Sequence, residues 1–528
     1  MAALALSVAI LAGPAAAEVP VPRLAPSPSM TAVSLDAADP AAAPALPIEE
    51  AIRREATVDV ALAVADFYEA RDHAPVWTPE RAAALRARLA AAAYDGLDPA
   101  DYFVPEAGPG GLSPAAEEVA LTEAALRYAR HATSGRVKPT SISRIVTMEP
   151  PQLDEARFLR RLAASRRIPL LLERLHPRHP QFVALREKLA AALDSASKQP
   201  PAVGGGPNLK RGSQEPRVAI LRARLGATVM RGSDPTVFDE TLDAAVRAYQ
   251  RAEGLHADGI VGPRTIALLD DGLDSDPVSA LVSNMERWRW LPRALGPHYV
   301  MVNVPGYRVR VMSGGKASYD GRVIVGAVGH PTPVFSDEME HIVVNPYWNV
   351  PISIASSEML GAIRRNPRGY FARRGYEAVY NGRVVDPGAI SWSRGALSRV
   401  RIRQKPGRGN ALGAVKFMFP NKHAVYLHDT PTKHLFQRDR RAFSHGCVRV
   451  ENPFDFADAL LAKSETLSGR GLSRMVGGKQ RWLKLDAHIP VHLTYFTREV
   501  TPDGRLVRHD DIYGYDRRTQ KALGFVGG

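Results

Sequence analysis

The stretch from residue 426 to residue 450 reads YLHDTPTKHLFQRDRRAFSHGCVRV and contains Cys447, the only cysteine among 528 residues. The cysteine follows Ser-His-Gly at 444–446 and precedes the apolar run Val448–Val450. A second histidine, His428, ends the run Ala-Val-Tyr-Leu-His. Both apolar runs have the composition that favours β-strands. The stretch therefore predicts two strands, with a sharp turn at Gly446 just before the second.

This combination of residue types indicates thiol chemistry. A thiol attacks an acyl carbon as the thiolate, and a free cysteine has a pKa of about 8.5, so it needs a base or a cation nearby. We expect His428, on a neighbouring strand, to be the base. We expect His445 either to lie on the oxyanion side or to contact the catalytic residues without touching the substrate. The backbone N–H groups of Gly446 and Cys447 are the candidate oxyanion donors. The alternative at this point is an inert thiol, which is what a lone buried cysteine usually is.

The beginning of the chain indicates export. The first 17 residues, MAALALSVAILAGPAAA, carry no charged side chain, and the apolar run 2–12 is followed by Gly-Pro and three alanines. This is typical of a secretory signal with cleavage after Ala17, although the usual positive residues before the apolar run are missing. A membrane anchor is the alternative, but the segment is short of about 20 residues and contains a proline. In an oxidising compartment a lone cysteine has no internal partner, so a structural disulfide is not expected.

The length of the chain and its net charge limit the class of protein. At about 100–200 residues per domain, 528 residues predict three or four folded units. The formal net charge of +14 suits an anionic partner such as nucleic acid, a membrane surface or a cell-wall polymer. No dense Lys/Arg block of the kind that grips phosphate backbones is present. We therefore expect no nucleic acid partner and no stable membrane span, and a solvated basic surface is the plainer interpretation.

Outward from the cysteine, β-type patterns extend over residues 298–516 and are interrupted by helical and loop patterns at about 352–415. Near their end, two strand-like runs surround an Asp503-Gly504 turn, which predicts a hairpin. Upstream, helical periodicity predicts a scaffold over residues 49–200, with helices around 114–134, 154–174 and 180–197, and a connecting helix within 273–297. The sequence therefore predicts a multidomain α+β fold. The remaining segments are 1–17 as the signal, 18–48 as an Ala/Pro-rich linker, 201–216 as a Gly/Pro linker, 217–272 as a compact three-helix block and 517–528 as a tail.

The block at 217–272 carries a signature of its own. Apolar residues recur at helical spacing on two of its segments, and Pro263 begins a third helix. The pattern YQ…GL…DGIVGP.T resembles the peptidoglycan-binding domain of bacterial wall enzymes. Most of the matching positions belong to the core or to turns, so the resemblance identifies a fold and no ligand contact. The matching residues are Ala245, Tyr249, Gln250, Gly254, Leu255, Asp258, Gly259, Gly262 and Thr265.

The cysteine region also resembles a known family. YLHD at 426–429 followed by SHGCVRV at 444–450 looks like the catalytic signature of the YkuD-type L,D-transpeptidases. The resemblance implies that Cys447 is the nucleophile and His428 the base, oriented by a backbone carbonyl rather than by an acid side chain. It implies that Ser444, His445 and Gly446 complete the site. Arg449 is expected to contact a substrate carboxylate, because a guanidinium fork matches that group.

The resemblance extends to the large Gram-negative branch of that family. The segments NPYWNVP at 345–351 and NALGAVKFMFPN at 410–421 match it, and the N-terminal segments DFYEARDHAPVW and AAAYDGLDPADY resemble its scaffold. The branch combines a helical scaffold, a peptidoglycan-binding domain and a β-rich catalytic domain with a mostly helical capping insert, here 352–415. Tyr426, Trp348 and Asn349 are the further substrate-binding residues that the resemblance implies.

The implied function is a periplasmic L,D-transpeptidase that makes 3→3 peptidoglycan cross-links through a thioester and releases D-alanine. The expected partners are tetrapeptide stems, with a diaminopimelate side chain as acceptor; we expect no metal, no organic cofactor and a monomer. Three alternatives stay open. One is a cysteine amidase or carboxypeptidase acting on stem peptides, and another is a non-catalytic wall anchor. The third is a zinc peptidase using His423, His428, His434 and His445, although no H-E-x-x-H or C-x-x-C spacing is present.

Overall fold

The computed structural model describes residues 48–55, 61–109, 111–195, 203–204, 206–229, 233–253, 255–269 and 277–525. The predicted signal, nearly all of the linker at 18–48 and part of the linker at 201–216 lie outside the described residues. The chain divides into two compact units. One comprises Ala190–Pro277, and the other comprises the described residues up to Leu189 together with Val278–Leu523. The predicted multidomain α+β fold is confirmed.

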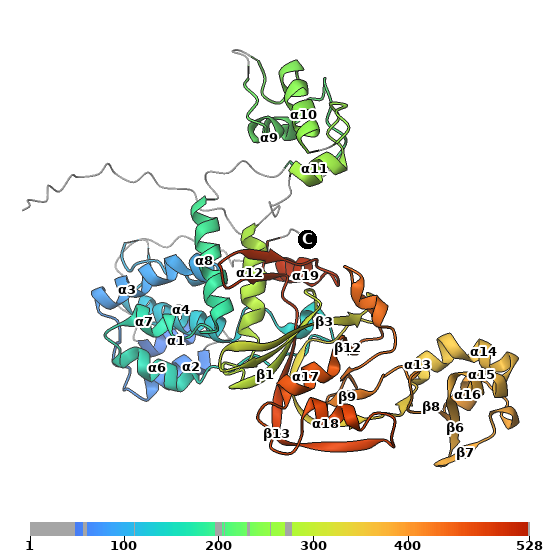
Figure 1. The fold of residues 1–528 in the computed structure, drawn as a ribbon. Coiled ribbons are helices and arrows are strands. Elements are labelled where there is room, and N and C mark those ends of the chain that lie inside the picture. Colours follow the sequence, from blue (N-terminus) through green and yellow to red (C-terminus); the bar gives the residue numbers. More distant parts are fainter. Residues whose placement is uncertain are drawn as a thin grey trace, which may run out of the picture. The chain divides into compact units, whose positions relative to one another are not determined.

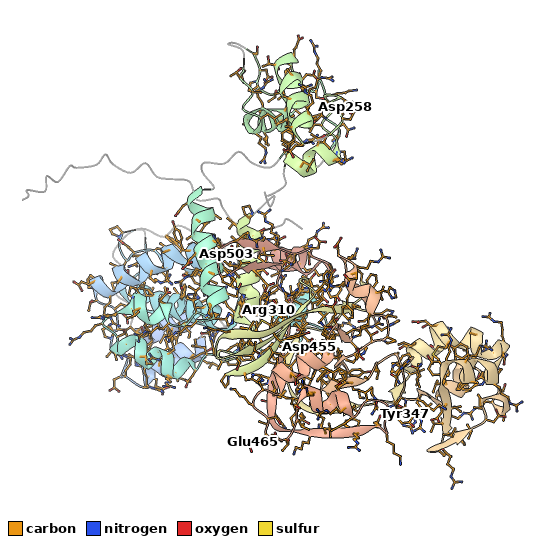
Figure 2. The ribbon with its side chains drawn as sticks, viewed as in Figure 1. Asp258, Arg310, Tyr347, Asp455, Glu465 and Asp503 are labelled. Carbon is orange, nitrogen blue, oxygen red and sulfur yellow. The ribbon has the colours of Figure 1, made fainter. Side chains whose placement is uncertain are left out.

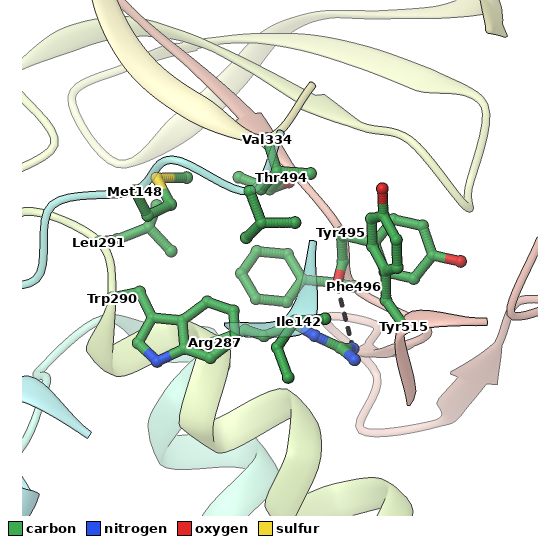
Figure 3. Close-up of a pocket in the computed structure, with 11 residues that line it drawn as sticks. Ile142, Met148, Arg287, Trp290, Leu291, Val334, Thr494, Tyr495, Phe496 and Tyr515 are labelled. Carbon is green, nitrogen blue, oxygen red and sulfur yellow. Dashed lines mark hydrogen bonds between the residues drawn. The ribbon is translucent and has the colours of Figure 1, made fainter. Parts of the chain in front are cut away.

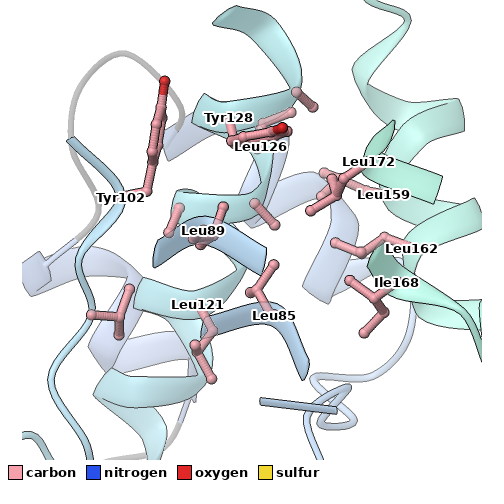
Figure 4. Packing of buried hydrophobic residues seen from close by; sticks show 14 of the residues in the cluster. Leu85, Leu89, Tyr102, Leu121, Leu126, Tyr128, Leu159, Leu162, Ile168 and Leu172 are labelled. Atoms are coloured by element: carbon pink, nitrogen blue, oxygen red, sulfur yellow. The ribbon is translucent and has the colours of Figure 1, made fainter. Parts of the chain in front are cut away.

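The scaffold is built around the long helix α4 (Pro114–Ser134). Ser113 begins it by accepting a hydrogen bond from the Ala116 N–H, Pro114 occupies its first turn, and Gly135 ends it. Leucines and tyrosines from five helices pack against its buried face (Figure 4). The other scaffold helices are α1 (Ile48–Glu55), α2 (Ala61–Glu69), α3 (Pro79–Ala90), η1 (Ala91–Asp95), η2 (Pro99–Tyr102), α5 (Pro139–Ile142), α6 (Glu155–Ala164), α7 (Ile168–Glu173) and α8 (Pro180–Ser195).

One helix expected at 154–174 is two helices, α6 and α7. The break has a local cause: Ser165 leaves the helical conformation and its Oγ accepts a hydrogen bond from the Arg167 N–H, while Pro169 sits in the first turn of α7. Proline lacks the N–H that a continuous helix would need at that position. The continuous prediction over this span was therefore wrong.

The small unit contains the three expected helices, α9 (Pro216–Arg224), α10 (Glu240–Ala252) and α11 (Pro263–Leu269). Their apolar faces form a separate core with Leu209, Phe238 and Val261. Gln250, only 1% exposed, explains much of the motif, because its amide accepts from the Gly259 N–H and donates to Asp258 and to the Ile260 carbonyl. Asp258 is labelled in Figure 2. The resemblance therefore reflects a polar clamp that fixes the turn 258–260.

The region that contains Cys447 is built on a nine-stranded sheet of order β11-β3-β12-β10-β9-β4-β13-β1-β2. Strands β2 and β3 also pair, which closes the sheet on itself. Its strands are β1 (His298–Asn303), β2 (Arg308–Ser313), β3 (Lys316–Gly326), β4 (Phe335–Val344), β9 (Val415–Met418), β10 (Leu427–His428), β11 (Ala442–Ser444), β12 (Val448–Val450) and β13 (Arg481–Thr494). Helices α17 (Pro453–Leu460) and α18 (Gly469–Arg474) follow β12, and α19 (Tyr515–Ala522) ends the region.

The hairpin expected around Asp503-Gly504 is present as β14 (Arg498–Val500) and β15 (Leu506–Arg508), paired antiparallel. Gly504 has a φ of +83°, and its N–H donates to the Thr501 carbonyl. The turn therefore uses the left-handed conformation that glycine adopts at little cost. Asp503, labelled in Figure 2, marks its tip.

The insert at 352–415 forms a lobe with its own core (Figure 1). A four-stranded sheet of order β5-β8-β6-β7 supports it, so the expectation of helices and loops alone was incomplete. These strands are two to five residues long and gain their stability from pairing and from the lobe's core rather than from a long alternating pattern. The elements are β5 (Trp348–Asn349), α13 (Ile352–Ile354), η3 (Ala355–Met359), α14 (Leu360–Arg365), α15 (Pro367–Arg374), β6 (Tyr376–Tyr380), β7 (Arg383–Val385), η4 (Pro387–Ala389), α16 (Arg394–Leu397) and β8 (Arg401–Gln404).

Helix α12 (Pro277–Arg289) joins the scaffold to the catalytic sheet. Its buried Glu286 accepts hydrogen bonds from the Arg136 and Val137 N–H groups of the scaffold. Arg287 pairs with Asp516 of α19 at 2.5 Å. Figure 3 shows a small cavity beside these residues, lined by Trp290, Phe496 and their apolar neighbours. None of its lining residues belongs to the cysteine region, so it is a packing gap of the junction.

Candidate active site

Three neighbouring strands bring the predicted residues onto one face of the sheet. His428 of β10 pairs with Arg449 of β12 on one side and with Lys416 of β9 on the other. Residues paired directly across strands project to the same face, and so do residues two apart along a strand. Tyr426 and His428 therefore share this face with Arg449, and Cys447, two residues before Arg449, reaches it at the start of β12.

The turn before the cysteine is fixed by side-chain hydrogen bonds. Ser444, 3% exposed, donates through Oγ to the Cys447 carbonyl at 2.5 Å and accepts from the Gly446 N–H at 3.1 Å. The buried Thr332 hydroxyl donates to the Gly446 carbonyl at 2.8 Å. Gly446 has a φ of +113°, where a side chain would be strained. The sharp turn expected at Gly446 is therefore present, and it aims the backbone of residue 447 at β10.

The same hydrogen bonds alter the expected oxyanion site. The Gly446 N–H already has the Ser444 hydroxyl as its acceptor. Among the described residues the Cys447 N–H has no such partner. In this conformation the Gly446 N–H holds the turn and the Cys447 N–H is the donor left for an oxyanion, so the role expected of both amides stays a prediction.

Cys447 is a half-buried free thiol surrounded by hydrogen-bond donors and cations. Burial raises the pKa of the thiol, while hydrogen bonds from the backbone and hydroxyl of Tyr426 and the charges of Arg449 and Lys416 act to lower it. Burial and the neighbouring cysteine also raise the pKa of the Tyr426 phenol. The net direction is upward, so the resting sulfur is a neutral thiol whose neighbours favour the thiolate once the proton leaves.

His428 is 4% exposed and is held by the backbone. Its Nδ1 lies 2.5 Å from the Asp429 carbonyl oxygen. A carbonyl can only accept, so Nδ1 carries the proton and Nε2 is the nitrogen able to receive one. Burial, and then the charge of Arg449, lower the pKa of the imidazole to about 3. The ring is therefore neutral at physiological pH, as a general base must be. Its ring centroid lies 5.7 Å from that of Tyr426, which acts to lower the pKa of the Cys447 thiol.

Arg449 is a partly buried cation without a carboxylate. Its Nη1 donates to the Thr432 hydroxyl at 3.2 Å, and its Nε has no partner among the described residues. Burial lowers the pKa of the guanidinium, and Cys447 is the neighbour that raises it. The unpaired Nε–H leaves a donor for an anionic ligand.

The structure places three of the predicted residues outside the sulfur's immediate contacts. His445, just before the turn, directs Nε2 to Glu358 Oε1 of the insert at 2.7 Å and stacks obliquely on His330 at 4.8 Å between ring centroids. Trp348 packs on the insert's core, with its ring 6.3 Å from that of Tyr376. Asn349 is exposed beside it.

The chain enters the insert at residues 347–349 and leaves it near Arg403, and this junction, called the root below, is basic and aromatic. Arg403 places its guanidinium 4.5 Å from the ring centroid of Tyr347, which is labelled in Figure 2. The Tyr347 N–H donates to the Gln480 side chain at 2.7 Å, which ties the root to the segment that leads into β13. Trp348 and Asn349 therefore belong to this root.

Sequence reasoning missed Lys416, Thr332 and Glu358. Lys416 is a charged residue in the apolar strand pattern KFMFP. A charge in such a strand is costly to bury and therefore indicates a special role, so this signal was available from the sequence. Thr332 and Glu358 carry no such signal, because only the tertiary fold brings them to the turn and to His445.

Three of the four histidines of the zinc alternative have other partners. His423 bonds Thr147 at 2.8 Å, His428 bonds a backbone carbonyl, and His445 bonds Glu358. Within the ranges that the structure describes, no group of three or more His, Cys, Asp or Glu residues is placed to hold a metal ion. In the same part of the chain no helix is long and apolar enough to cross a bilayer.

Comparisons with known families agree with this geometry. Residues 297–468 match the family model described as "L,D-transpeptidase catalytic domain", residues 215–269 match "Putative peptidoglycan binding domain", and residues 62–189 match "Scaffold domain". The YkuD-type catalytic domain and the peptidoglycan-binding domain expected from the sequence are therefore confirmed.

Individual proteins are also similar. A Haemophilus influenzae protein described as "Putative L,D-transpeptidase" is 36% identical over 251 residues, which are 47% of this chain and 50% of that protein. The chain thus spans about half the length of the curated relative that it matches. Two solved structures align with 55% of this chain, both at a TM-score of 0.15, which carries no argument. They are an L,D-transpeptidase from Xylanimonas cellulosilytica (16% identity, 98% of that chain) and a fused Zn-dependent amidase/peptidase/peptidoglycan-binding protein from Clostridium acetobutylicum (13%, 100%).

Proposed function

We propose, from the premise that residues 297–468 form an L,D-transpeptidase catalytic domain, that this protein joins peptidoglycan stems by cysteine acyl transfer. The product would be a 3→3 cross-link, formed from a tetrapeptide stem with release of D-alanine. The observation that carries the proposal is the environment of the chain's one thiol. The charges of Arg449 and Lys416 and the hydrogen bonds of Tyr426 favour the Cys447 thiolate, and His428, which carries its proton on Nδ1, lies opposite Arg449 on the neighbouring strand.

In the first half-reaction the Cys447 thiol gives its proton to His428 Nε2. The sulfur attacks the carbonyl carbon between the diaminopimelate L-centre and the terminal D-alanine, so a C–S bond forms and the carbonyl becomes an oxyanion. The Cys447 N–H and the Tyr426 hydroxyl are the donors near that oxygen. The C–N bond then breaks, His428 returns the proton to the leaving amine, and D-alanine departs, leaving a thioester.

In the second half-reaction the side-chain amine of another stem attacks the thioester. The amine proton passes to His428, the C–S bond breaks, and the sulfur recovers its proton. Atoms and charge balance without a metal or organic cofactor. Arg449 supports substrate binding in this scheme, because its unpaired Nε–H suits a stem carboxylate. Trp348 and Asn349, at the root of the insert, are proposed to contact the same stem.

The insert supports transfer over hydrolysis. Glu358 of its η3 segment bonds His445, two residues before the cysteine, so the lobe touches the segment that carries the sulfur and is proposed to cover its approach. Keeping water from a thioester lengthens its lifetime and lets an amine act first. The peptidoglycan-binding domain would hold the chain on the wall polymer, whose anionic character suits a net charge of +14. A wall substrate also implies an extracytoplasmic location, which we propose is the periplasm.

The test is intact-protein mass spectrometry after incubation with a disaccharide-tetrapeptide. We expect the wild type to gain the mass of the acyl donor minus D-alanine, and then to yield a cross-linked dimer, while Cys447→Ala does neither. An adduct that is released only as free tripeptide, with an amine acceptor present, would indicate the hydrolytic amidase instead. No adduct on folded, reduced wild type would sink the catalytic proposal and favour a wall-binding role.

A further inference from the structure

Lys416 occupies an unusual position for a charged residue. It lies in the four-residue strand β9, between His428 of β10 and Val343 of β4, and it shares their face of the sheet. Its side chain is 9% exposed. Lysine is almost never this buried unless it is paired. The position therefore calls for an explanation.

Aromatic rings hold the ammonium in place. Nζ lies 5.3 Å from the ring centroid of Tyr426 and 5.2 Å from that of Trp482. Each contact is a cation–π interaction, which is stronger where water is partly excluded. Tyr426 lies two residues before His428 on the same face, and its hydroxyl and backbone act to lower the pKa of the Cys447 thiol. The two rings therefore fix the ammonium on the sulfur's side of the sheet.

No carboxylate compensates this charge. Among the described residues Lys416 makes no ion pair and no side-chain hydrogen bond, and burial lowers the pKa of its ammonium. The one neighbour whose ionisation favours the charged lysine is Cys447. Val343 and Trp482, from the strands on its other side, bring no charge. A buried cation without a partner is costly, so its natural counter-ion is a transient anion at this site.

We propose that the Lys416 ammonium is the second cation of the active site, and that with Arg449 it stabilises the anionic sulfur of Cys447. The two cations flank His428, one on each neighbouring strand. The positive charge of the ammonium acts electrostatically on the Cys447 sulfur without touching the substrate, so Lys416 is a positioning residue for the nucleophile. The inference rests on the proposed function in taking that sulfur as the nucleophile, but its test needs no substrate.

The test measures the alkylation of the Cys447 thiol, and the signal comes from this residue alone because the chain has one cysteine. The rate of alkylation by iodoacetamide is measured from pH 6 to pH 11 on the full chain. The groups that face the sulfur are Tyr426, Arg449 and Lys416, with His428 beside Tyr426. In Lys416→Met we expect the midpoint of the pH profile to rise by about one unit, and the rate at pH 7 to fall about tenfold, because one pKa unit is a factor of ten. The limiting rate at high pH should stay unchanged.

Two further variants separate charge from packing. Lys416→Arg keeps the charge and should keep the wild-type midpoint. Lys484→Met removes an exposed charge from β13, three strands from β10, and should leave the profile unchanged because solvent screens it. An unchanged midpoint in folded Lys416→Met, or an equal shift in Lys484→Met, would overturn the proposal. Lys416→Gln repeats the measurement if the methionine variant does not fold.

This readout separates the two proposals. An acyl adduct on wild type with no midpoint shift in Lys416→Met would leave the transpeptidase function standing and remove the role of the lysine. A midpoint shift without any acyl adduct would establish the charge coupling and count against the transpeptidase function.

Discussion

His445 Nε2 lies 2.7 Å from Glu358 Oε1, and this contact joins the turn before the cysteine to the insert. Both side chains are substantially exposed, at 39% and 52%. A polar contact this exposed contributes at most about 1 kcal/mol, so it can bias the position of the lobe without locking it. The oblique stacking of His445 on His330 orients the imidazole toward the lobe.

Removing this contact should open the approach to the sulfur. In Glu358→Gln we expect a bulky maleimide to label Cys447 about two- to fivefold faster, which is the factor that 0.4–1 kcal/mol provides. Labelling by iodoacetamide should change little, because a small reagent needs no opening. Asp386→Asn is the matched control, since it weakens an exposed ion pair with Arg368 inside the same lobe. Equal acceleration in both variants would mean that general loosening, and not this contact, is responsible.

Replacing the base should abolish acylation without unfolding the chain. His428→Gln removes the nitrogen that receives the thiol proton, and general-base catalysis is typically worth 10²–10⁴-fold. We expect a loss of this size in the rate of adduct formation, measured by mass spectrometry. His423→Gln, whose imidazole contacts Thr147, should retain the wild-type rate within a few fold. A His428→Gln variant that acylates at the wild-type rate would assign the base elsewhere.

The turn at Gly446 offers a test of backbone strain. Its φ is +113°, yet an added Cβ would lie 3.7 Å from the nearest atom, the Pro331 carbonyl oxygen. Gly446→Ala should therefore cost only the conformational strain, about 1–3 kcal/mol of unfolding free energy. At Gly326 a Cβ would lie 2.1 Å from the His330 carbonyl oxygen, so Gly326→Ala should be more disruptive. Urea unfolding of both variants checks this order, and the reverse order would contradict it.

The sequence predicted the nucleophile and base as a pair because both follow from a local pattern of residue types around one cysteine. Their roles stay predictions, but the structure does place them on neighbouring strands. Lys416 and Glu358 reach the site only through strand register and the fold of the insert, and neither is visible in local spacing. Strands β6 and β7 were missed although their pairing is local. Tyr380 pairs with Arg383 across Asn381-Gly382, whose positive φ values and Asn-Gly sequence are a hairpin signal that was available.

Acid should destabilise the catalytic unit through its buried histidines. Burial lowers the pKa of His428 and His131 to about 3, and that of His179 and His492 to about 4. The ordinary histidine value is about 6.5, so between that pH and 4 the unfolded chain binds more protons than the folded one, and stability falls as pH falls. Each such group contributes about 2 kcal/mol of loss by pH 5.

Urea unfolding at pH 7.5 and pH 5 checks this sign. His492 is a neutral donor and acceptor, bonding the Leu295 carbonyl through Nε2 and the Ser336 hydroxyl through Nδ1. His492→Gln removes one titrating group. The unfolding free energy of this variant should therefore fall less steeply between pH 7.5 and pH 5 than that of wild type, by a slope of up to one proton. A stability that is flat or rises on acidification would refute the argument.

The small unit should unfold separately from the catalytic unit when its clamp is broken. Gln250 is 1% exposed and holds the turn 258–260 through the Gly259 N–H and the Asp258 carboxylate. Gln250→Leu leaves that buried N–H without an acceptor, at a cost of about 1–3 kcal/mol. Because the unit has its own core, we expect its thermal transition to fall while the alkylation profile of Cys447 stays unchanged. Gln214→Leu, at an exposed amide that bonds Asp234 in the same unit, is the control and should leave both unchanged. A coupled loss of both transitions in Gln250→Leu would mean that the two units fold as one.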